Sequence, residues 1–298
     1  MKAKVQNFAG IVGHRSWIAP HLVKYLENLG LGIVMLDKAD IENTDYGSFD
    51  VVYLIAGRAH PTKVELQAEE KLCETLGKHK RPPRKIVYLS SAMVDRWERG
   101  SRPLSPAGEA YVLTKKRCEQ ALLGEPHRKP LCFSVRAPVI FGPGQAIESD
   151  MLIPTVARAR VWLEPISLLR PVDPFELVYI TDLVKAFAEV GTIDESLLMP
   201  ITSVRSDVMR TPLDIVSMAA PGHPISISKG WTSNKVSGRE SGMRHVREVV
   251  LTFKDNDVLT TMQWYEAEHG TSRQLVARDS SHTLDIPHHH LLDIGGEG

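Results

Sequence analysis

Residues 7–37, NFAGIVGHRSWIAPHLVKYLENLGLGIVMLD, contain two short apolar runs on either side of an amphipathic segment. The runs at residues 7–12 and 32–36 have the length and composition of buried strands. Between them, apolar residues at positions 18, 22, 26 and 29 recur with helical spacing, which predicts a helix over residues 18–29. A strand, a helix and a second strand in this order normally form a parallel pair with a right-handed crossover. This segment therefore predicts the first unit of a parallel sheet.

The same alternation continues through the first half of the chain. Apolar strands are predicted at residues 51–56, 85–89 and 131–135, with helices at residues 64–76 and 110–123 between them. Strands that are apolar throughout and separated by helices are typical of a parallel sheet covered on both faces. The sequence therefore predicts an α/β fold with a doubly wound, Rossmann-like parallel sheet, in which ligands bind at the carboxyl ends of the strands.

After Gly144 the pattern becomes weaker. Helices are predicted at residues 151–160, 182–190 and 262–269 and a strand at residues 177–180, whereas residues 191–240 are rich in Pro, Gly and Ser. We assign residues 1–145 and 177–195 to a dinucleotide-binding part. Residues 146–176 and 196–285 are assigned to a small C-terminal substrate-binding lobe, and residues 286–298 to a disordered tail.

The composition argues against several classes of function. Lys and Arg together number 36, as do Asp and Glu, so the net charge is zero and does not favour binding to nucleic acid or a membrane surface. The three cysteines, Cys73, Cys118 and Cys132, are widely spaced and odd in number, which argues against a disulfide framework or a zinc site. No apolar run approaches the roughly 18 residues of a membrane span, and the first residues lack the pattern of a signal peptide. We expect a cytoplasmic protein without a metal site.

The turn after the first strand carries a degraded glycine motif. Gly13, Ser16 and Ala19 occupy the three positions of G-x-x-G-x-x-G, the phosphate-binding turn of dinucleotide folds. Gly13 can make the tight turn and Ala19 permits close packing of helix on sheet, whereas the Ser16 side chain narrows the approach of a pyrophosphate. On its own, this motif is equally compatible with an ordinary strand–helix turn.

Asp37, at the end of the second strand, strengthens the cofactor interpretation. A carboxylate there can accept hydrogen bonds from both ribose hydroxyls of NAD and repels the 2′-phosphate of NADP. Arg15 and Lys38 act in the opposite direction, because either could pair with that phosphate. We therefore predict NAD as the cofactor and keep NADP as the alternative.

A strand ending in two serines precedes a Tyr/Lys pair. Ser91 ends the run KIVYLSS at residues 85–91, and Tyr111 and Lys115 follow four positions apart in a helical segment. Residues at this spacing share one helix face, so the Lys115 ammonium should lie beside the Tyr111 hydroxyl and stabilise its phenolate. The three residues suit proton transfer at a carbinol carbon. The competing interpretation is a chance Y-x-x-x-K in which Tyr111 is an ordinary half-buried residue.

Taken together, these motifs resemble the extended short-chain dehydrogenase/reductase family, and in particular its NAD-dependent epimerase/dehydratase group. The resembling segments follow the family's order at residues 13–23, 32–37, 50–57, 85–91, 111–115, 136–144 and 178–187. The resemblance implies that Tyr111 is the acid/base, that Ser91 orients the substrate and that Lys115 also holds the nicotinamide ribose. It further implies that the dinucleotide contacts Gly13, Arg15, Ser16, Asp37, Ala56 and Gly57, and that Pro138 lies near the nicotinamide.

The chain departs from the family at positions that bear on the reaction. Ala92 and Met93 follow Ser91 where the family's dehydratases carry Asp-Glu, so elimination of water is not expected. Phe175 stands where the family often has an arginine that holds a nucleotide phosphate, which argues against a nucleotide-sugar substrate. The resemblance still favours a sugar-nucleotide 4-epimerase or 4-ketoreductase, and the sequence does not separate these two reactions.

The sequence leaves one alternative from another functional class. The degraded glycine motif favours a non-catalytic NAD(P)-binding sensor or assembly module, whereas the intact Ser91, Tyr111 and Lys115 favour an enzyme. Family members often pair through the helix that carries the Tyr and Lys, so a homodimer is a further expectation of the resemblance.

Overall fold

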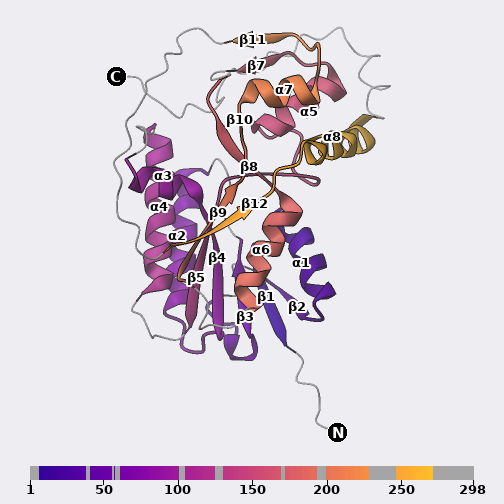
Figure 1. Cartoon of the computed structure of the whole chain (residues 1–298). Coiled ribbons are helices and arrows are strands. Elements are labelled where there is room, and N and C mark those ends of the chain that lie inside the picture. The colour runs from indigo at the N-terminus through magenta and orange to yellow at the C-terminus, as the bar shows by residue number, and fades with distance from the viewer. Residues whose placement is uncertain are drawn as a thin grey trace. The chain divides into compact units, whose positions relative to one another are not determined.

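The computed structural model describes residues 7–37, 41–55, 57, 61–100, 105–124, 130–168, 172–192, 199–227 and 246–270. These residues form two compact units (Figure 1). The first contains the described residues of Met1–Pro138, Ile180–Arg205 and Val236–Leu251, and the second contains those of Val139–Tyr179, Ser206–Lys235 and Thr252–Gly298. Each unit has its own sheets and its own hydrophobic core, as a compact domain requires.

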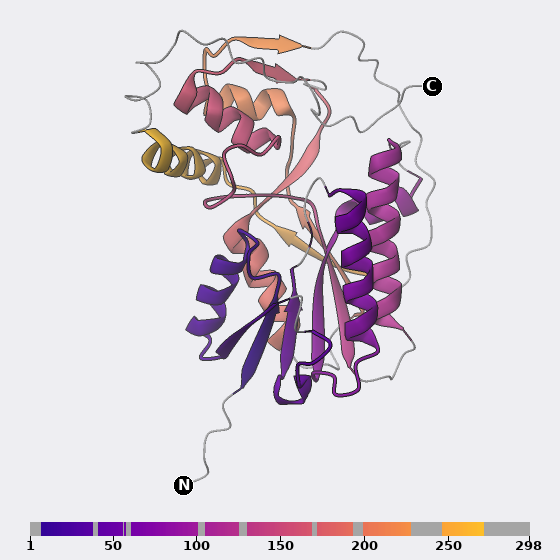
Figure 2. The same ribbon diagram turned by 180° about the vertical axis from the view of Figure 1, so that it is seen from behind.

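The first unit is built on a seven-stranded sheet with the order β12-β9-β5-β4-β3-β1-β2. Its neighbouring strands from β9 to β2 are parallel. The strands are β1 (Phe8–Val12), β2 (Gly32–Leu36), β3 (Val51–Leu54), β4 (Lys85–Ser91), β5 (Leu131–Ala137), β9 (Ile201–Ser206) and β12 (Val246–Leu251). Helices α1 (Ala19–Asn28) and α6 (Ile180–Thr192) cover one face, and α2 (Lys63–Gly77), α3 (Ala92–Glu98) and α4 (Pro106–Leu123) cover the other (Figures 1 and 2). This is the doubly wound α/β sheet that the sequence predicts.

Local sequence explains how the first elements form. A Cβ atom at Gly10, in the middle of β1, would lie 2.7 Å from Leu36 Cδ1, so a larger residue there would have to displace the Leu36 side chain. Leu22 and Leu26 of α1 are fully buried, as the helical spacing of apolar residues predicts. Helix α2 begins at a capping box, in which Thr62 Oγ1 accepts from the Glu65 backbone N–H and Glu65 Oε2 accepts from that of Thr62.

The second unit is smaller and mixes short strands with helices. Its strands are β6 (Val139–Phe141), β7 (Ile166–Leu168), β8 (Phe175–Tyr179), β10 (Met209–Arg210) and β11 (Ile225–Ile227). Strand β8 pairs in parallel with β6 and antiparallel with β10, and β7 pairs in parallel with β11. Helices α5 (Leu152–Trp162), α7 (Pro212–Ala219) and α8 (Asp255–His269) enclose a core that includes Val156, Ile215 and Met262.

Most predicted elements of the first half agree with the structure to within a few residues, but others were not predicted. Helix α3 begins directly after β4, where the sequence analysis placed only the end of a strand. Strand β9 carries Thr202 and Ser203 at buried positions, so it contains no continuous apolar run. Strands β9 and β12 both extend the large sheet, whereas the sequence analysis assigned residues 196–285 to the substrate-binding lobe.

Two further expectations from the sequence concern the C-terminal tail and membrane-spanning segments. The tail assigned to residues 286–298 lies outside the described residues. Of the helices that the structure describes, none combines the length and the apolar character that a membrane span needs.

Candidate active site

The Tyr/Lys pair lies on α4, which covers the sheet beside β4. Ser105 fixes the start of this helix, because its Oγ accepts a hydrogen bond of 3.1 Å from the Gly108 backbone N–H. Tyr111 is half-buried and Lys115 is buried. The Lys115 Nζ lies 5.6 Å from the centroid of the Tyr111 ring and 3.4 Å from the Leu89 carbonyl oxygen of β4. The structure therefore brings the two predicted residues together, one turn apart on the same helix face.

Ser91 is the last residue of β4, at the carboxyl end of the sheet. Its Oγ accepts a hydrogen bond of 3.2 Å from the Met93 backbone N–H and so caps α3. A hydroxyl has one proton and two lone pairs. Accepting this hydrogen bond therefore leaves the Ser91 proton available for donation to a second partner. Ser91 is the register partner of Ala137 on β5, and Pro138 follows immediately. Ser91 and Pro138 thus share one edge of the sheet.

Glu69 is a member of this cluster that the sequence analysis did not identify. The Lys115 Nζ donates a hydrogen bond of 2.7 Å to Glu69 Oε1, and the Tyr88 hydroxyl donates one of 2.8 Å to the same oxygen. Glu69 is 3% exposed and Lys115 is 4% exposed, so this is an ion pair in the interior. One sequence signal could have revealed it: Glu69 lies three positions after Leu66 and three before Leu72, on the apolar stripe of α2.

The ion pair determines the charge of the lysine. Burial alone lowers the pKa of Lys115, but the negative charge of Glu69 outweighs it, and the pKa lies above the ordinary value for lysine. Burial, together with the charge of Glu69, raises the pKa of Tyr88, which is therefore a neutral donor. The cluster consequently holds one cation and one anion in contact.

Gly57, after β3, lies against this ion pair. Its φ is +138°, a backbone conformation that residues with side chains rarely adopt. A Cβ atom at this position would lie 3.0 Å from Lys115 Nζ and 3.1 Å from Glu69 Oε1. The backbone at the carboxyl end of β3 thus approaches the Lys115–Glu69 pair closely. Ala56, the other predicted contact in this loop, lies outside the described residues.

The turn after β1 is formed by Gly13 and Ser16 and leads into α1. Gly13 has a φ of +93°, and its carbonyl oxygen accepts a hydrogen bond of 2.9 Å from the Ser16 backbone N–H. The Ser16 Oγ accepts one of 3.3 Å from the Ile18 N–H. Helix α1 has no acidic residue in its first turn, so its positive end carries no compensating carboxylate of its own. These features suit an anionic ligand at the N-terminus of α1.

Arg15 and Asp37 come together at the ends of β1 and β2. The Arg15 Nη2 and Asp37 Oδ2 atoms are 3.4 Å apart, with side chains 85% and 45% exposed. An exposed pair of this kind contributes little to stability, so both groups can change partners at low cost. Lys38, the third residue weighed for recognition of the ribose, lies outside the described residues.

A buried charge network attaches α4 to the sheet. Arg136, at 2% exposure, lies on β5 and donates hydrogen bonds of 2.6 Å to Asp95, 2.9 Å to Glu98 and 2.6 Å to Glu119. These carboxylates belong to α3 and α4, and Ser203 of β9 donates to the second oxygen of Asp95 at 2.5 Å. The guanidinium of β5 thus joins α3 to α4, and Asp95 extends the network to β9. The network attaches the helix that carries Tyr111 to the sheet.

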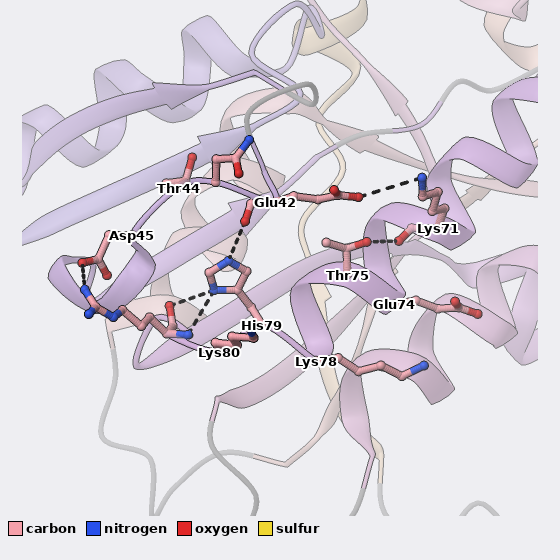
Figure 3. A pocket seen from close by; sticks show the side chains of 11 residues that line it. Glu42, Thr44, Asp45, Lys71, Glu74, Thr75, Lys78, His79 and Lys80 are labelled. Atoms are coloured by element: carbon pink, nitrogen blue, oxygen red, sulfur yellow. Dashed lines mark hydrogen bonds and ion pairs between the residues drawn. The ribbon is translucent and has the colours of Figure 1, made fainter.

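A pocket of about 660 Å³ lies elsewhere in the first unit (Figure 3). It is lined by residues of segment 42–45, the C-terminal part of α2 and the loop at residues 78–81. His79 joins its sides, because its Nδ1 accepts from the Arg81 N–H at 3.2 Å and its Nε2 lies 3.4 Å from the Glu42 carbonyl oxygen. Arg81 also pairs with Asp45 at 2.8 Å. No predicted site residue lines this pocket, so it is separate from the candidate active site.

Comparisons by sequence give no relative: no protein-family model matches the chain. No curated protein sequence matches it either. Several solved structures do resemble it. MoeE5, in complex with UDP-glucose and NAD, has a TM-score of 0.65 at 18% identity, covering 90% of this chain and 100% of that one. TunA, an NAD-dependent NDP-hexosamine 5,6-dehydratase involved in tunicamycin biosynthesis, has a TM-score of 0.66 at 15% identity, covering 89% and 100%.

A third similar structure is the UDP-glucose 4-epimerase of Thermotoga maritima with UDP-glucose. Its TM-score is 0.64 at 13% identity, and the match covers 88% of this chain and 99% of that one. At these identities the likeness shows the fold. The chain therefore shares its doubly wound α/β fold with these solved structures.

Proposed function

We propose that the chain is an NAD(P)-dependent enzyme that acts on a nucleotide sugar, as a 4-epimerase or a 4-ketoreductase. One observation carries the proposal. The Lys115 ammonium lies 5.6 Å from the Tyr111 ring centroid and 3.4 Å from the Leu89 carbonyl oxygen, two residues before Ser91 at the strand end. Tyr111 and Lys115 therefore lie together on α4 beside β4, and β4 ends at Ser91. In doubly wound sheets, ligands bind at the carboxyl ends of the strands.

The residues at the carboxyl ends of β1, β2 and β3 fit an NAD molecule. Gly13 and Ser16 would receive the pyrophosphate at the start of α1, and Asp37 would accept hydrogen bonds from the adenosine ribose. Gly57 would let the cofactor pass close to β3, and Pro138 would lie beside the nicotinamide. When bound, NAD accepts or donates a hydride at the carbinol carbon of the substrate. The exposed Arg15 keeps NADP as the alternative cofactor.

The chain's own residues would handle the proton. Tyr111 takes the hydroxyl proton of the substrate during oxidation and returns it during reduction. Lys115 stabilises the phenolate form of Tyr111 through its positive charge, and it would also hold the nicotinamide ribose. Ser91 donates a hydrogen bond to the reacting oxygen, which orients the substrate. Water elimination would need a further acid, and Asp95 is committed to Arg136 and Ser203.

A nucleotide sugar is the substrate class that we propose. MoeE5 and the Thermotoga maritima epimerase were both solved with UDP-glucose. Phe175 replaces an arginine of the family pattern, but Arg210 is its direct partner across the β8–β10 pair. Directly opposed residues of an antiparallel pair project from the same face, so Arg210 and Phe175 share one face of this strand pair of the second unit. Arg210 pairs with Asp255 at 2.8 Å, and the Asp255 side chain is 56% exposed.

A second candidate function is a non-catalytic NAD(P)-binding module, and the Lys115–Glu69 ion pair is the observation that favours it. A lysine whose charge is already compensated polarises a neighbouring phenol less than an unpaired one. A homodimer through α4 remains an expectation from the family resemblance. On this helix, Lys116 and Arg117 pair within the chain, with Glu98 at 3.2 Å and Glu70 at 3.4 Å.

The test uses the purified full-length chain and UDP-glucose. NAD retained through purification, together with conversion of UDP-glucose to its 4-epimer, supports the epimerase. Turnover of a 4-keto nucleotide sugar with added NAD(P)H but no retained cofactor supports the ketoreductase. Cofactor binding without turnover of either substrate would favour the module instead.

The Tyr111→Phe variant tests the assigned proton transfer. Because this substitution removes only the phenolic oxygen, we expect kcat to fall by at least about 100-fold while NAD affinity is retained. Unchanged turnover in Tyr111→Phe would exclude the phenol as the acid/base.

A further inference from the structure

We infer that Glu69 is a positioning residue of the proposed site, which holds the Lys115 ammonium in place beside Gly57. The inference rests on the proposed function for its catalytic consequence, but the contact itself can be tested without any substrate. Glu69 would not touch substrate or cofactor, and it would act only through Lys115.

The geometry places Glu69 at the meeting point of four elements. Glu69 lies on α2, its two hydrogen-bond donors lie on α4 and β4, and Gly57 follows β3. A Cβ atom at Gly57 would lie 3.1 Å from Oε1 and 3.2 Å from Oε2, so the carboxylate fills the space under that glycine. In this position Lys115 Nζ contacts Glu69 Oε1 at 2.7 Å and also lies 5.6 Å from the centroid of the Tyr111 ring.

Lys115 carries its positive charge in the interior of the protein, at 4% exposure. An unpaired buried ammonium is costly, and a lysine in this position normally loses its proton instead. Among the residues that the structure describes, the second acceptor of Lys115 is the Leu89 carbonyl oxygen at 3.4 Å, which is a long hydrogen bond. Glu69, at 2.7 Å, is therefore the group that keeps Lys115 charged. Without that charge, Tyr111 would lose the cation that stabilises its phenolate.

The other titratable groups around Lys115 do not supply this charge. Besides Glu69, the titratable groups that influence the pKa of Lys115 or of its neighbours are Cys73 of α2, Tyr88 of β4, and Tyr111 and Cys118 of α4. Burial raises the pKa of Cys73, as it does that of Tyr88, so both are neutral in the physiological range. Among these groups, Glu69 is the one carboxylate.

The first experiment follows the protonation of Lys115 directly. In full-length protein labelled with ¹³C at lysine Cε, the Lys115 signal is assigned by its loss in Lys115→Met and is titrated with pH. We expect no titration of the wild-type signal up to about pH 10, because its pKa lies above the ordinary lysine value of about 10.4. In Glu69→Gln we expect the pKa of Lys115 to fall below the ordinary lysine value of about 10.4. A Glu69→Gln signal that titrates at or above the ordinary value would overturn the inference.

Two further variants separate charge from fold. Tyr88→Phe removes a hydrogen bond to the same carboxylate oxygen but leaves the carboxylate, so the pKa of Lys115 should stay high. Glu69→Asp keeps the charge on a shorter side chain, so the pKa should fall less than in Glu69→Gln. This variant also serves if Glu69→Gln does not fold. Equal shifts in Tyr88→Phe and Glu69→Asp would indicate general loosening of the cluster and would contradict the inference.

The catalytic consequence is read from a pH profile. With UDP-glucose and NAD, the alkaline limb of kcat/KM should move to lower pH in Glu69→Gln, by the same amount as the Lys115 titration. A purely structural glutamate would lower activity at every pH without moving that limb. If wild-type protein binds no NAD, the proposed function fails, yet the lysine titration still decides whether Glu69 controls Lys115.

Discussion

A side chain at position 57 would meet the Lys115 ammonium at 3.0 Å and would have to adopt a φ of +138°. Both conditions follow from one arrangement, because the buried Lys115–Glu69 pair fills the space on the side where a Cβ atom would project. The identity of Gly57 is thus fixed by the packing of charged groups, in addition to any cofactor that passes over it.

Gly57→Ala should reduce the free energy of unfolding by about 3 kcal/mol, from backbone strain and from displacement of the ion pair. Gly30→Ala is the matched control: its φ is +79°, but no atom lies within 4 Å of the added Cβ. We expect the control to cost only about 1 kcal/mol. Urea unfolding of both variants checks this, and equal losses would show that the Lys115–Glu69 pair does not constrain position 57.

Among the secondary-structure elements, α4 depends most on buried charge. Arg136 of β5 is its electrostatic attachment, through Glu119 of the same helix. Arg136→Leu should therefore reduce the free energy of unfolding by about 3–5 kcal/mol, because it leaves buried carboxylates without a counter-ion. The control is Arg117→Leu, which removes an ion pair with Glu70 in which the arginine is 58% exposed. That loss should stay below about 1 kcal/mol. A cost for Arg136→Leu no greater than that of the control would contradict the role of the network.

Helix α7 of the second unit begins at a capping box formed by Thr211 and Asp214. A hydrogen bond from the Thr211 backbone N–H lowers the pKa of Asp214 below its ordinary value. A lowered pKa adds stability above the unfolded-state value, and this stability is lost as the pH falls through the folded-state value. Asp214→Ala should therefore cost up to about 1 kcal/mol near pH 7, and the difference from wild type should shrink below about pH 4. Thermal unfolding at both pH values tests this, and a difference that grows in acid would contradict the assignment.

The sequence predicts the apolar elements of this fold well and the polar ones poorly. Strand β2 has the predicted bounds, because its run GIVML stands between a helix and Asp37. Strand β9 and helix α3 were not predicted, because their buried residues include the polar Ser203 and Asp95. These two side chains are hydrogen-bonded to each other although they are far apart in the sequence. The partners of Glu69 also lie on other elements. Its place on the apolar stripe of α2 indicates burial, but this local pattern does not identify Lys115 as its partner.

The chain combines two compact units, and Ser91, Tyr111 and Lys115 all belong to the first. That unit has the sheet, the turn after β1 and the Tyr111/Lys115 helix in the order that a dinucleotide fold needs. The whole chain resembles solved structures with TM-scores of 0.65 and 0.66 at 18% and 15% identity, so the same fold is reached with a very different sequence. The proposed chemistry depends on whether a nicotinamide cofactor binds at this edge of the sheet.

Calorimetric titration of NAD into the purified wild-type chain and into Lys115→Met tests that claim most directly. We predict binding of one NAD per wild-type chain and an affinity at least tenfold lower for Lys115→Met, because the ribose would lose its ammonium partner. Folded wild-type protein that binds neither NAD nor NADP, or a Lys115→Met variant that binds NAD as tightly as wild type, would contradict the account.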